Sequence, residues 1–205
     1  MPRRLFILLF AVLCGVPTMA SAQSLRLEVK THPDRRTPLI RLYNLFDEDR
    51  WRDALVDKSY PIRLHWRLQL WRSRAGFDTP GPVNEWDVVI RREPLLEQYR
   101  FTETVGGRRV MDTAFSSVEE LRFHYERQQE VAGVAPTRDG EWYYAIRLEV
   151  TTLTFEDFDR LERLPGGAAP ASGIGAQIAR LLVTLSLPSA KLTQESPVFR
   201  VRRRN

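Results

Sequence analysis

The sequence predicts a mainly β protein: a two-layer antiparallel β-sandwich of about eight strands with two or three short α-helices. Apolar and polar residues alternate in many short segments, turn signals separate these segments, and few stretches have helical periodicity. Strands buried on both faces in a parallel sheet are continuous apolar runs instead, so this alternation favours antiparallel sheets with one buried face.

The clearest predicted strand spans residues 62–70, where apolar side chains occupy every second position. This pattern places Trp66 in the core and Arg67 on the opposite face, because successive side chains of a strand point to opposite sides. The segments expected to form strands are 25–29, 39–45, 62–70, 86–90, 99–101, 108–111, 144–150 and 198–201. The Gly- and Pro-rich residues 73–83 are expected to form a long connection between two of them.

Short helices are expected between the strands. Ser116 and Glu119 have the spacing of a capping box, which predicts a helix start at this point. The other expected helical segments begin at Asp47, at Thr154 with Asp157, and at Ser172, the last one covering residues 173–187.

The amino terminus predicts export. Arg3 and Arg4 precede a short apolar run, and Ala20-Ser21-Ala22 has the small-x-small pattern of a signal peptidase site, so residues 1–22 are interpreted as a signal peptide. The run is too short to cross a bilayer. Cys14 follows Leu13 rather than a small residue, which disfavours a lipoprotein, and the mature chain is expected to begin at Gln23.

The mature chain, residues 23–205, is expected to be one β-rich domain with a Gly/Pro/Ala linker at 165–171 and a basic tail at 200–205. It has 29 Lys and Arg residues against 26 acids once Arg3 and Arg4 are removed, and four of the arginines lie in the tail. A nearly neutral body is not typical of a nucleic-acid-binding protein. Without cysteine, it must be stabilised by burial of apolar surface rather than by disulfides.

No pattern predicts an enzyme or a cofactor. The three histidines, His32, His65 and His124, are isolated and lack metal-ligand spacing. The acids at 119–120 and 156–159 are interpreted as helix-start residues, which the helix dipole favours. The sequence contains neither a nucleophile elbow nor a phosphate-binding loop. We therefore expect no catalytic residue, no metal and no cofactor.

Trp71, Arg72, Arg74 and Phe77 are the predicted binding residues. Trp71 is out of phase with the apolar face of its strand, and the other three lie in or beside the Gly/Pro-rich connection. Tyr143 is likewise out of phase with Tyr144. Exposed aromatic rings flanked by arginines, including Arg147, are typical of protein interfaces. The alternative is that a helix covers this second face of the sheet.

Several segments occur in a familiar order: LLEQYR at 95–100, AFSSVEEL at 114–121, WYYAIR at 142–147 and ESPVF at 195–199. In this order the chain resembles the exported bacterial family catalogued as domain of unknown function 4390, over most of residues 24–201. The resemblance implies a β-rich exported domain and brings no catalytic residue. In some bacteria, members of that family are encoded beside a membrane sensor kinase, so the resemblance implies a periplasmic accessory role.

These observations predict an exported, non-enzymatic binding or accessory domain in the periplasm or outside the cell. Its expected partner is an envelope membrane protein, such as a sensor kinase. Two alternatives remain open. A glycan-active hydrolase would need two carboxyl groups about 5–9.5 Å apart in a pocket, and a hydrophobic-ligand carrier would need an apolar cavity between the sheets.

Overall fold

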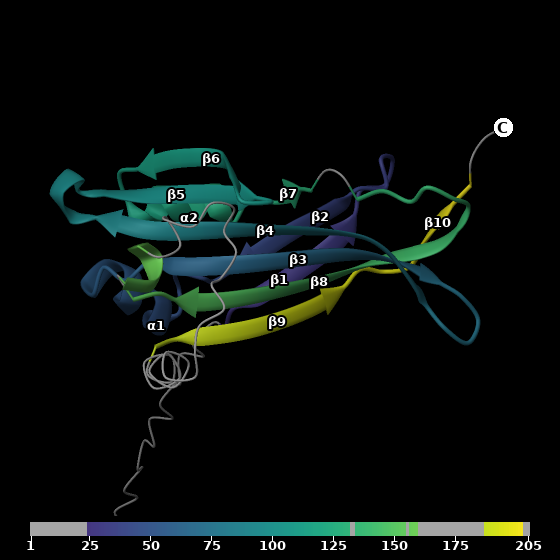
Figure 1. The fold of residues 1–205 in the computed structure, drawn as a ribbon, viewed down its shortest axis with the longest axis horizontal. Helices are drawn as coiled ribbons and strands as arrows, with labels where there is room; N and C mark the ends of the chain where they lie inside the picture. Colours follow the sequence, from purple (N-terminus) through teal and green to yellow (C-terminus); the bar gives the residue numbers. More distant parts are fainter. Residues whose placement is uncertain (1–23, 132–133, 155, 160–186, 203–205) are drawn as a thin grey trace, which may run out of the picture.

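The computed structural model describes residues 24–131, 134–154, 156–159 and 187–202, which form two antiparallel β-sheets in two layers (Figure 1). The mainly β sandwich class is therefore confirmed. The small sheet has the order β1 (Arg26–Thr31), β2 (Pro38–Tyr43) and β7 (Gln129–Glu130). The large sheet has the order β10 (Phe199–Val201), β8 (Gly140–Thr152), β3 (Ile62–Ser73), β4 (Thr79–Glu93), β5 (Gln98–Val105) and β6 (Arg108–Phe115), and β9 (Ser189–Glu195) pairs with β8 beside β10.

Two strands of the described residues, β7 and β9, were not expected from the sequence. β7 is only two residues long. β9 is a polar strand that pairs with β8 at the side of the sheet. Only Ala190 and Leu192 of this strand are partly buried, and its other residues are exposed. An edge strand that buries so little has no clear apolar alternation, which is the signal that identifies strands in a sequence.

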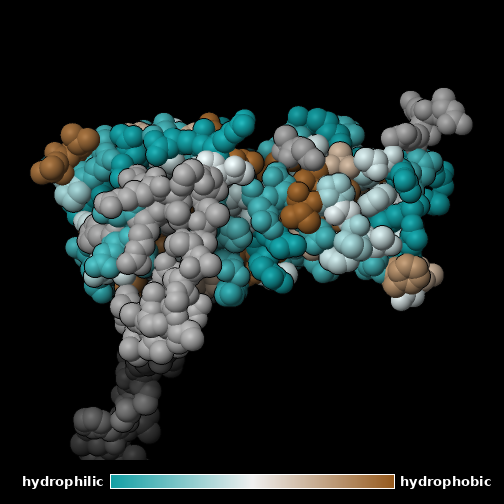
Figure 2. All heavy atoms as spheres, viewed as in Figure 1, coloured by the Kyte–Doolittle hydropathy of each residue, from teal (hydrophilic) through white to brown (hydrophobic). Residues whose placement is uncertain are grey.

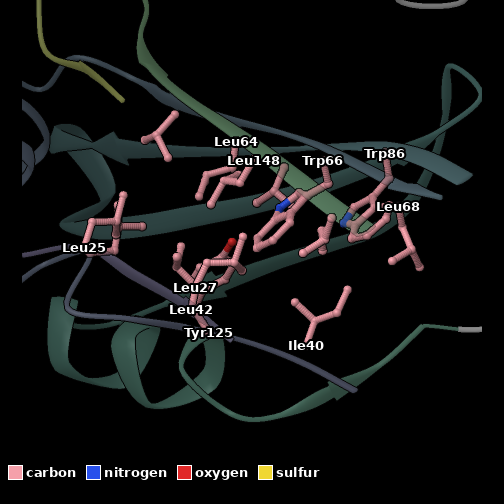
Figure 3. Close-up of a cluster of buried hydrophobic side chains, with 14 of the residues drawn as sticks. Leu25, Leu27, Ile40, Leu42, Leu64, Trp66, Leu68, Trp86, Tyr125 and Leu148 are labelled. Atoms are coloured by element: carbon pink, nitrogen blue, oxygen red, sulfur yellow. The ribbon is translucent and has the colours of Figure 1, made fainter. Parts of the chain in front are cut away.

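The core lies between the sheets and is centred on β3, which pairs with β4 on one side and β8 on the other. Its alternate residues from Ile62 to Leu70 are all buried, whereas Arg67 is exposed, as the alternation predicts. Figure 3 shows Leu27 and Leu42 of the small sheet facing the Trp66 layer of the large sheet. One face of the large sheet therefore packs in the core, and we call the other its outer face.

Short helices and turns connect the strands. α1 (Asp49–Arg52) continues into a π-helical turn, η1 (Asp53–Asp57), and a 3₁₀ turn, η2 (Pro94–Leu96), connects β4 to β5. The expected turn at Thr154 is present, since Asp157 N donates to Thr154 Oγ1 over 3.2 Å. Within the described ranges, no helix is long and apolar enough to span a membrane.

The helix α2 (Val118–Tyr125) begins one residue later than expected. Ser117, not Ser116, is the N-cap, and its hydroxyl accepts a hydrogen bond from Glu120 N at 3.1 Å. Ser116 instead donates from both its backbone N and its hydroxyl to the Glu120 carboxylate, each over 2.9 Å. Two consecutive serines followed by two glutamates fit a capping box in two registers, so the sequence alone did not distinguish them.

The predicted long connection at 73–83 is wrong. β3 continues to Ser73 and β4 begins at Thr79, which leaves a short loop at 74–78. Pro80, Gly81 and Pro82 lie inside β4, where the pairing with β3 shifts register. A Cβ on Gly81 would lie 2.9 Å from the Leu70 carbonyl oxygen, so the close approach of the strands needs glycine. Prolines are tolerated because a register shift interrupts the ladder of hydrogen bonds.

Several expectations concern residues outside the described ranges: the signal peptide, the linker at 165–171, the helix at 173–187 and the end of the tail at 203–205. Arg200 of the predicted tail lies within β10, paired with Glu141.

Candidate binding groove on the outer face of the large sheet

The four predicted binding residues do not form one surface. Trp71 lies on the outer face, whereas its neighbour Arg72 points to the other side of the sheet. The Arg72 guanidinium donates to the Asp139 carbonyl oxygen over 2.8 Å and lies 5.7 Å from the Trp142 ring centroid. Adjacent residues of a strand face opposite sides, so Trp71 and Arg72 cannot contact the same partner surface.

Arg74 and Phe77 lie in the loop of the β3–β4 hairpin, which projects beyond the body of the sandwich (Figure 1). Both are exposed, and Phe77 has 66% of its surface accessible. Arg74 N donates to the Asp78 carboxylate over 3.3 Å, which closes the loop. These two residues are therefore placed next to the outer face but not within its groove.

Trp71 stacks on Tyr143, which lies directly opposite it on β8. The ring centroids are 6.5 Å apart and the planes differ by 10°. The Tyr143 hydroxyl donates to Asp78 Oδ2 over 2.9 Å, which ties the stacked pair to the hairpin loop. Partial burial, the Asp78 carboxylate and Glu195 together raise the pKa of Tyr143 to about 12, so this hydroxyl remains protonated at neutral pH.

A groove of about 390 Å³ runs along the outer face from the stacked pair toward Arg67 and Arg147. These two arginines lie directly opposite each other on β3 and β8. Arg67 forms an ion pair with Glu85 at 3.2 Å, whereas Arg147 has no ion pair or hydrogen bond with any described residue. The remaining lining comes from Gln69, Ala145, Ile146, Thr193 and Glu195.

Among the described residues, no single acid pairs with both Arg67 and Arg147. Elsewhere opposite charges are matched: Arg63 with Asp87 at 2.8 Å, and Lys191 with Glu149 at 3.0 Å. Figure 2 shows the resulting surface as mostly hydrophilic. Arg91 and Arg100 also lie directly opposite each other, on β4 and β5, but Glu93 pairs with both, at 2.9 and 3.0 Å. Because like charges directly opposite across strands destabilise a sheet, the Arg67–Arg147 pair, which has no such shared acid among the described residues, is a local cost.

Sequence reasoning identified Trp71, Tyr143 and Arg147 as outward-facing but could not pair them. Alternation gives the face of each residue, and the strand register decides which residues meet. For Arg67, the alternation predicts only that it lies on the face of the strand opposite to Trp66. No local signal in the sequence would have found Arg67, because only the register between β3 and β8 places it opposite Arg147.

The acidic clusters lie at helix starts, as interpreted from the sequence. Glu119 and Glu120 are in the first turn of α2, and Asp157 bonds with Thr154. Among the described residues, no group of three His, Cys, Asp or Glu side chains could hold a metal ion.

No protein-family profile, curated protein or solved structure matches this chain.

Proposed function

We propose that this protein is an exported, non-enzymatic binding module whose outer-face groove captures an extended acidic segment of an envelope membrane protein. The observation that carries the proposal is the Arg67–Arg147 pair beside the Trp71–Tyr143 stack. The signal peptide predicted at residues 1–22 and the family resemblance support the compartment and the accessory role.

The chemistry of the groove favours a carboxylate. Arginine presents a planar array of donors that matches a carboxylate with two parallel hydrogen bonds. A carboxylate between Arg67 and Arg147 would offset their mutual repulsion. The charge of Arg147 helps to lower the pKa of Glu149, but Arg147 forms no ion pair with any described residue. The stacked rings of Trp71 and Tyr143 supply the adjoining apolar surface, and Trp, Tyr and Arg are the residues that most often dominate binding energy at interfaces.

The groove also favours an extended segment over a compact ligand. It follows the direction of β3 and β8 and is shallow, being lined by one face of a sheet. Side chains on alternate positions of an extended segment would meet the arginine pair and the aromatic pair in turn. Glu195, at the side of the groove, would disfavour a segment that is acidic at every position.

Site-specific photocrosslinking in intact cells tests the proposal. A photoreactive residue at Thr193, in the groove, is expected to yield one discrete adduct with an envelope protein. The same residue at Glu119, on the exposed side of α2, is the matched control and should not yield that adduct.

Charge reversal then links the adduct to the arginine pair. Arg147→Glu is expected to abolish the adduct formed from position 193, whereas Arg52→Glu, an exposed change on α1, should leave it intact. Circular dichroism confirms that both variants are folded. The proposal is overturned if folded Arg147→Glu protein forms the adduct at the wild-type level, or if position 119 gives the same adduct.

A further inference from the structure

A second cavity, of about 560 Å³, lies on the opposite side of the large sheet from the groove. One wall is the inner face of β4, β5 and β6, and the other is the segment that leads from the end of α2 into β7. We call it the inter-sheet cleft. Its volume is within the range of small-molecule binding sites, which is roughly 300–1,000 Å³.

The deep wall of the inter-sheet cleft is aromatic and rigid. Trp86 is 7% exposed, and its indole stacks on that of Trp66 with centroids 5.5 Å apart (Figure 3). Phe101 continues the wall along β5 and is buried. Met111, on β6, is 39% exposed and forms the adaptable side of the entrance. Methionine adjusts its shape to irregular ligands because its side chain is unbranched and flexible.

Glu103 is the unusual residue in this setting. The inward positions of β5 are Tyr99, Phe101 and then Glu103, so a carboxylate occupies the place of the next apolar side chain. It makes no ion pair or hydrogen bond with any described residue, and burial raises its pKa. The β5–β6 register shifts next to Glu103, opposite Met111. Such irregularities often re-aim side chains beside binding sites.

The other ionisable groups at the inter-sheet cleft do not neutralise Glu103. Arg127 lies over the Phe123 ring, 5.9 Å from its centroid, and Glu130 is held by Arg35 at 2.6 Å and by the Thr37 hydroxyl. His124 packs against Phe101 and Phe115, at 5.4 and 5.0 Å between centroids. Burial and Arg127 lower the pKa of His124, so this side chain is neutral at neutral pH.

The buried hydroxyl of Tyr125 also lies near Glu103. The Glu103 charge adds to burial in raising the pKa of Tyr125, which keeps the hydroxyl protonated. Trp66 Nε1 is close to this hydroxyl, but neither atom makes a well-formed hydrogen bond within the described residues. Glu103 therefore faces neutral groups on α2 and β3 rather than a cation.

We propose that the inter-sheet cleft binds a small organic cation with a flat apolar body. The Glu103 carboxylate would take the ammonium group, and Trp86 and Met111 would enclose the body. A half-buried carboxylate without a partner is costly, and a bound cation offsets that cost. The face of a tryptophan ring also attracts cations, which adds to the preference for positive charge over a neutral ligand.

Tryptamine is the cationic probe, and indole-3-propionate is its matched anion with the same ring. Titration of the ¹⁵N-labelled mature protein followed by NMR is expected to show tryptamine shifting the Trp86 indole N–H signal, with indole-3-propionate binding at least tenfold more weakly. A tenfold ratio corresponds to about 1.4 kcal/mol, close to the lower end of the range for a hydrogen bond to a charged group.

Two variants locate the binding at Glu103. Glu103→Gln keeps the shape and is expected to weaken tryptamine binding about tenfold or more, whereas Glu97→Gln, at an exposed turn, should not change it. Met111→Lys places an ammonium group directly across from Glu103 and is expected to abolish binding while the spectrum stays dispersed.

The proposal fails if tryptamine does not bind, if indole-3-propionate binds equally well, or if either folded variant binds tryptamine like the wild type. Arg147→Glu lies on the other side of the sheet and should leave tryptamine binding unchanged. The experiments therefore distinguish failure of the proposal for the inter-sheet cleft from failure of the proposal for the outer-face groove.

Discussion

Trp66 and Trp86 lie directly opposite each other on β3 and β4, and their indole planes differ by only 5°. The pair connects the hydrophobic core to the inter-sheet cleft. Trp66 is at the centre of the core, and Trp86 forms the deep wall of the inter-sheet cleft. Offset-stacked rings add about 0.5–1.5 kcal/mol to what burial alone contributes, so this pair fixes the relative position of β3 and β4 as well as filling space.

Trp66→Ala is expected to destabilise the protein by about 3–5 kcal/mol, through lost transfer energy and an unfilled cavity. Trp71→Ala is a matched control, since it removes the same side chain from the same strand on the outer face. It should cost only about 1–2 kcal/mol, because Trp71 is only partly buried. Urea unfolding of the two variants checks the difference. Equal losses would mean that the faces of β3 are assigned wrongly by one residue.

Local patterns predicted the faces of the strands but not their neighbours. The alternation in 62–70 placed Trp66 inside and Arg67 outside because a strand has a two-residue period. The Arg67–Arg147 and Trp71–Tyr143 pairs depend on the register between segments about 75 residues apart, which no local pattern encodes.

The sequence alone did not predict the inter-sheet cleft either. Glu103 continues an inward alternation, but a single charged residue in a strand is usually interpreted as solvent-facing. Only the packing of α2 and β7 against β5 shows that its position faces the interior. The polar edge strand β9 was missed for the related reason that an exposed strand needs no apolar face.

Ser117→Ala is expected to lower the free energy of unfolding by about 1 kcal/mol, because the hydroxyl of Ser117 caps Glu120 N at the start of α2. Ser116→Ala should cost less, since its backbone N still donates to the Glu120 carboxylate after the hydroxyl is removed. Chemical denaturation of both variants measures the difference. A larger loss for Ser116→Ala would place the helix start at the residue that the sequence pattern first indicated.

Maturation gives a prediction for the amino terminus. The protein recovered from the cell envelope should begin at Gln23, because Ala20-Ser21-Ala22 follows the apolar run as a cleavage site. Intact-mass spectrometry of the exported protein checks the expected terminus. A retained leader, or a diacylglyceryl group on Cys14, would contradict the prediction, and Ala22→Pro should block cleavage if the site is correct.

Partial burial of Glu103 is expected to make the stability of the folded protein depend on pH. Burial raises its pKa above the ordinary value of 4.5, so the folded protein holds this proton more tightly than the unfolded chain does. Stability therefore falls as the pH rises between the unfolded and the folded pKa, and above both the carboxylate opposes folding.

Glu103→Gln removes this ionisation and keeps the shape of the side chain. We expect the variant to be more stable than the wild type at about pH 7, with the gain shrinking as the pH falls and disappearing below about pH 4. Urea unfolding across this range measures the gain, and Glu97→Gln, an exposed change, should show none. A variant less stable than the wild type at neutral pH would show that Glu103 already has a stabilising partner. Such a result would also remove the reason for a cation in the inter-sheet cleft.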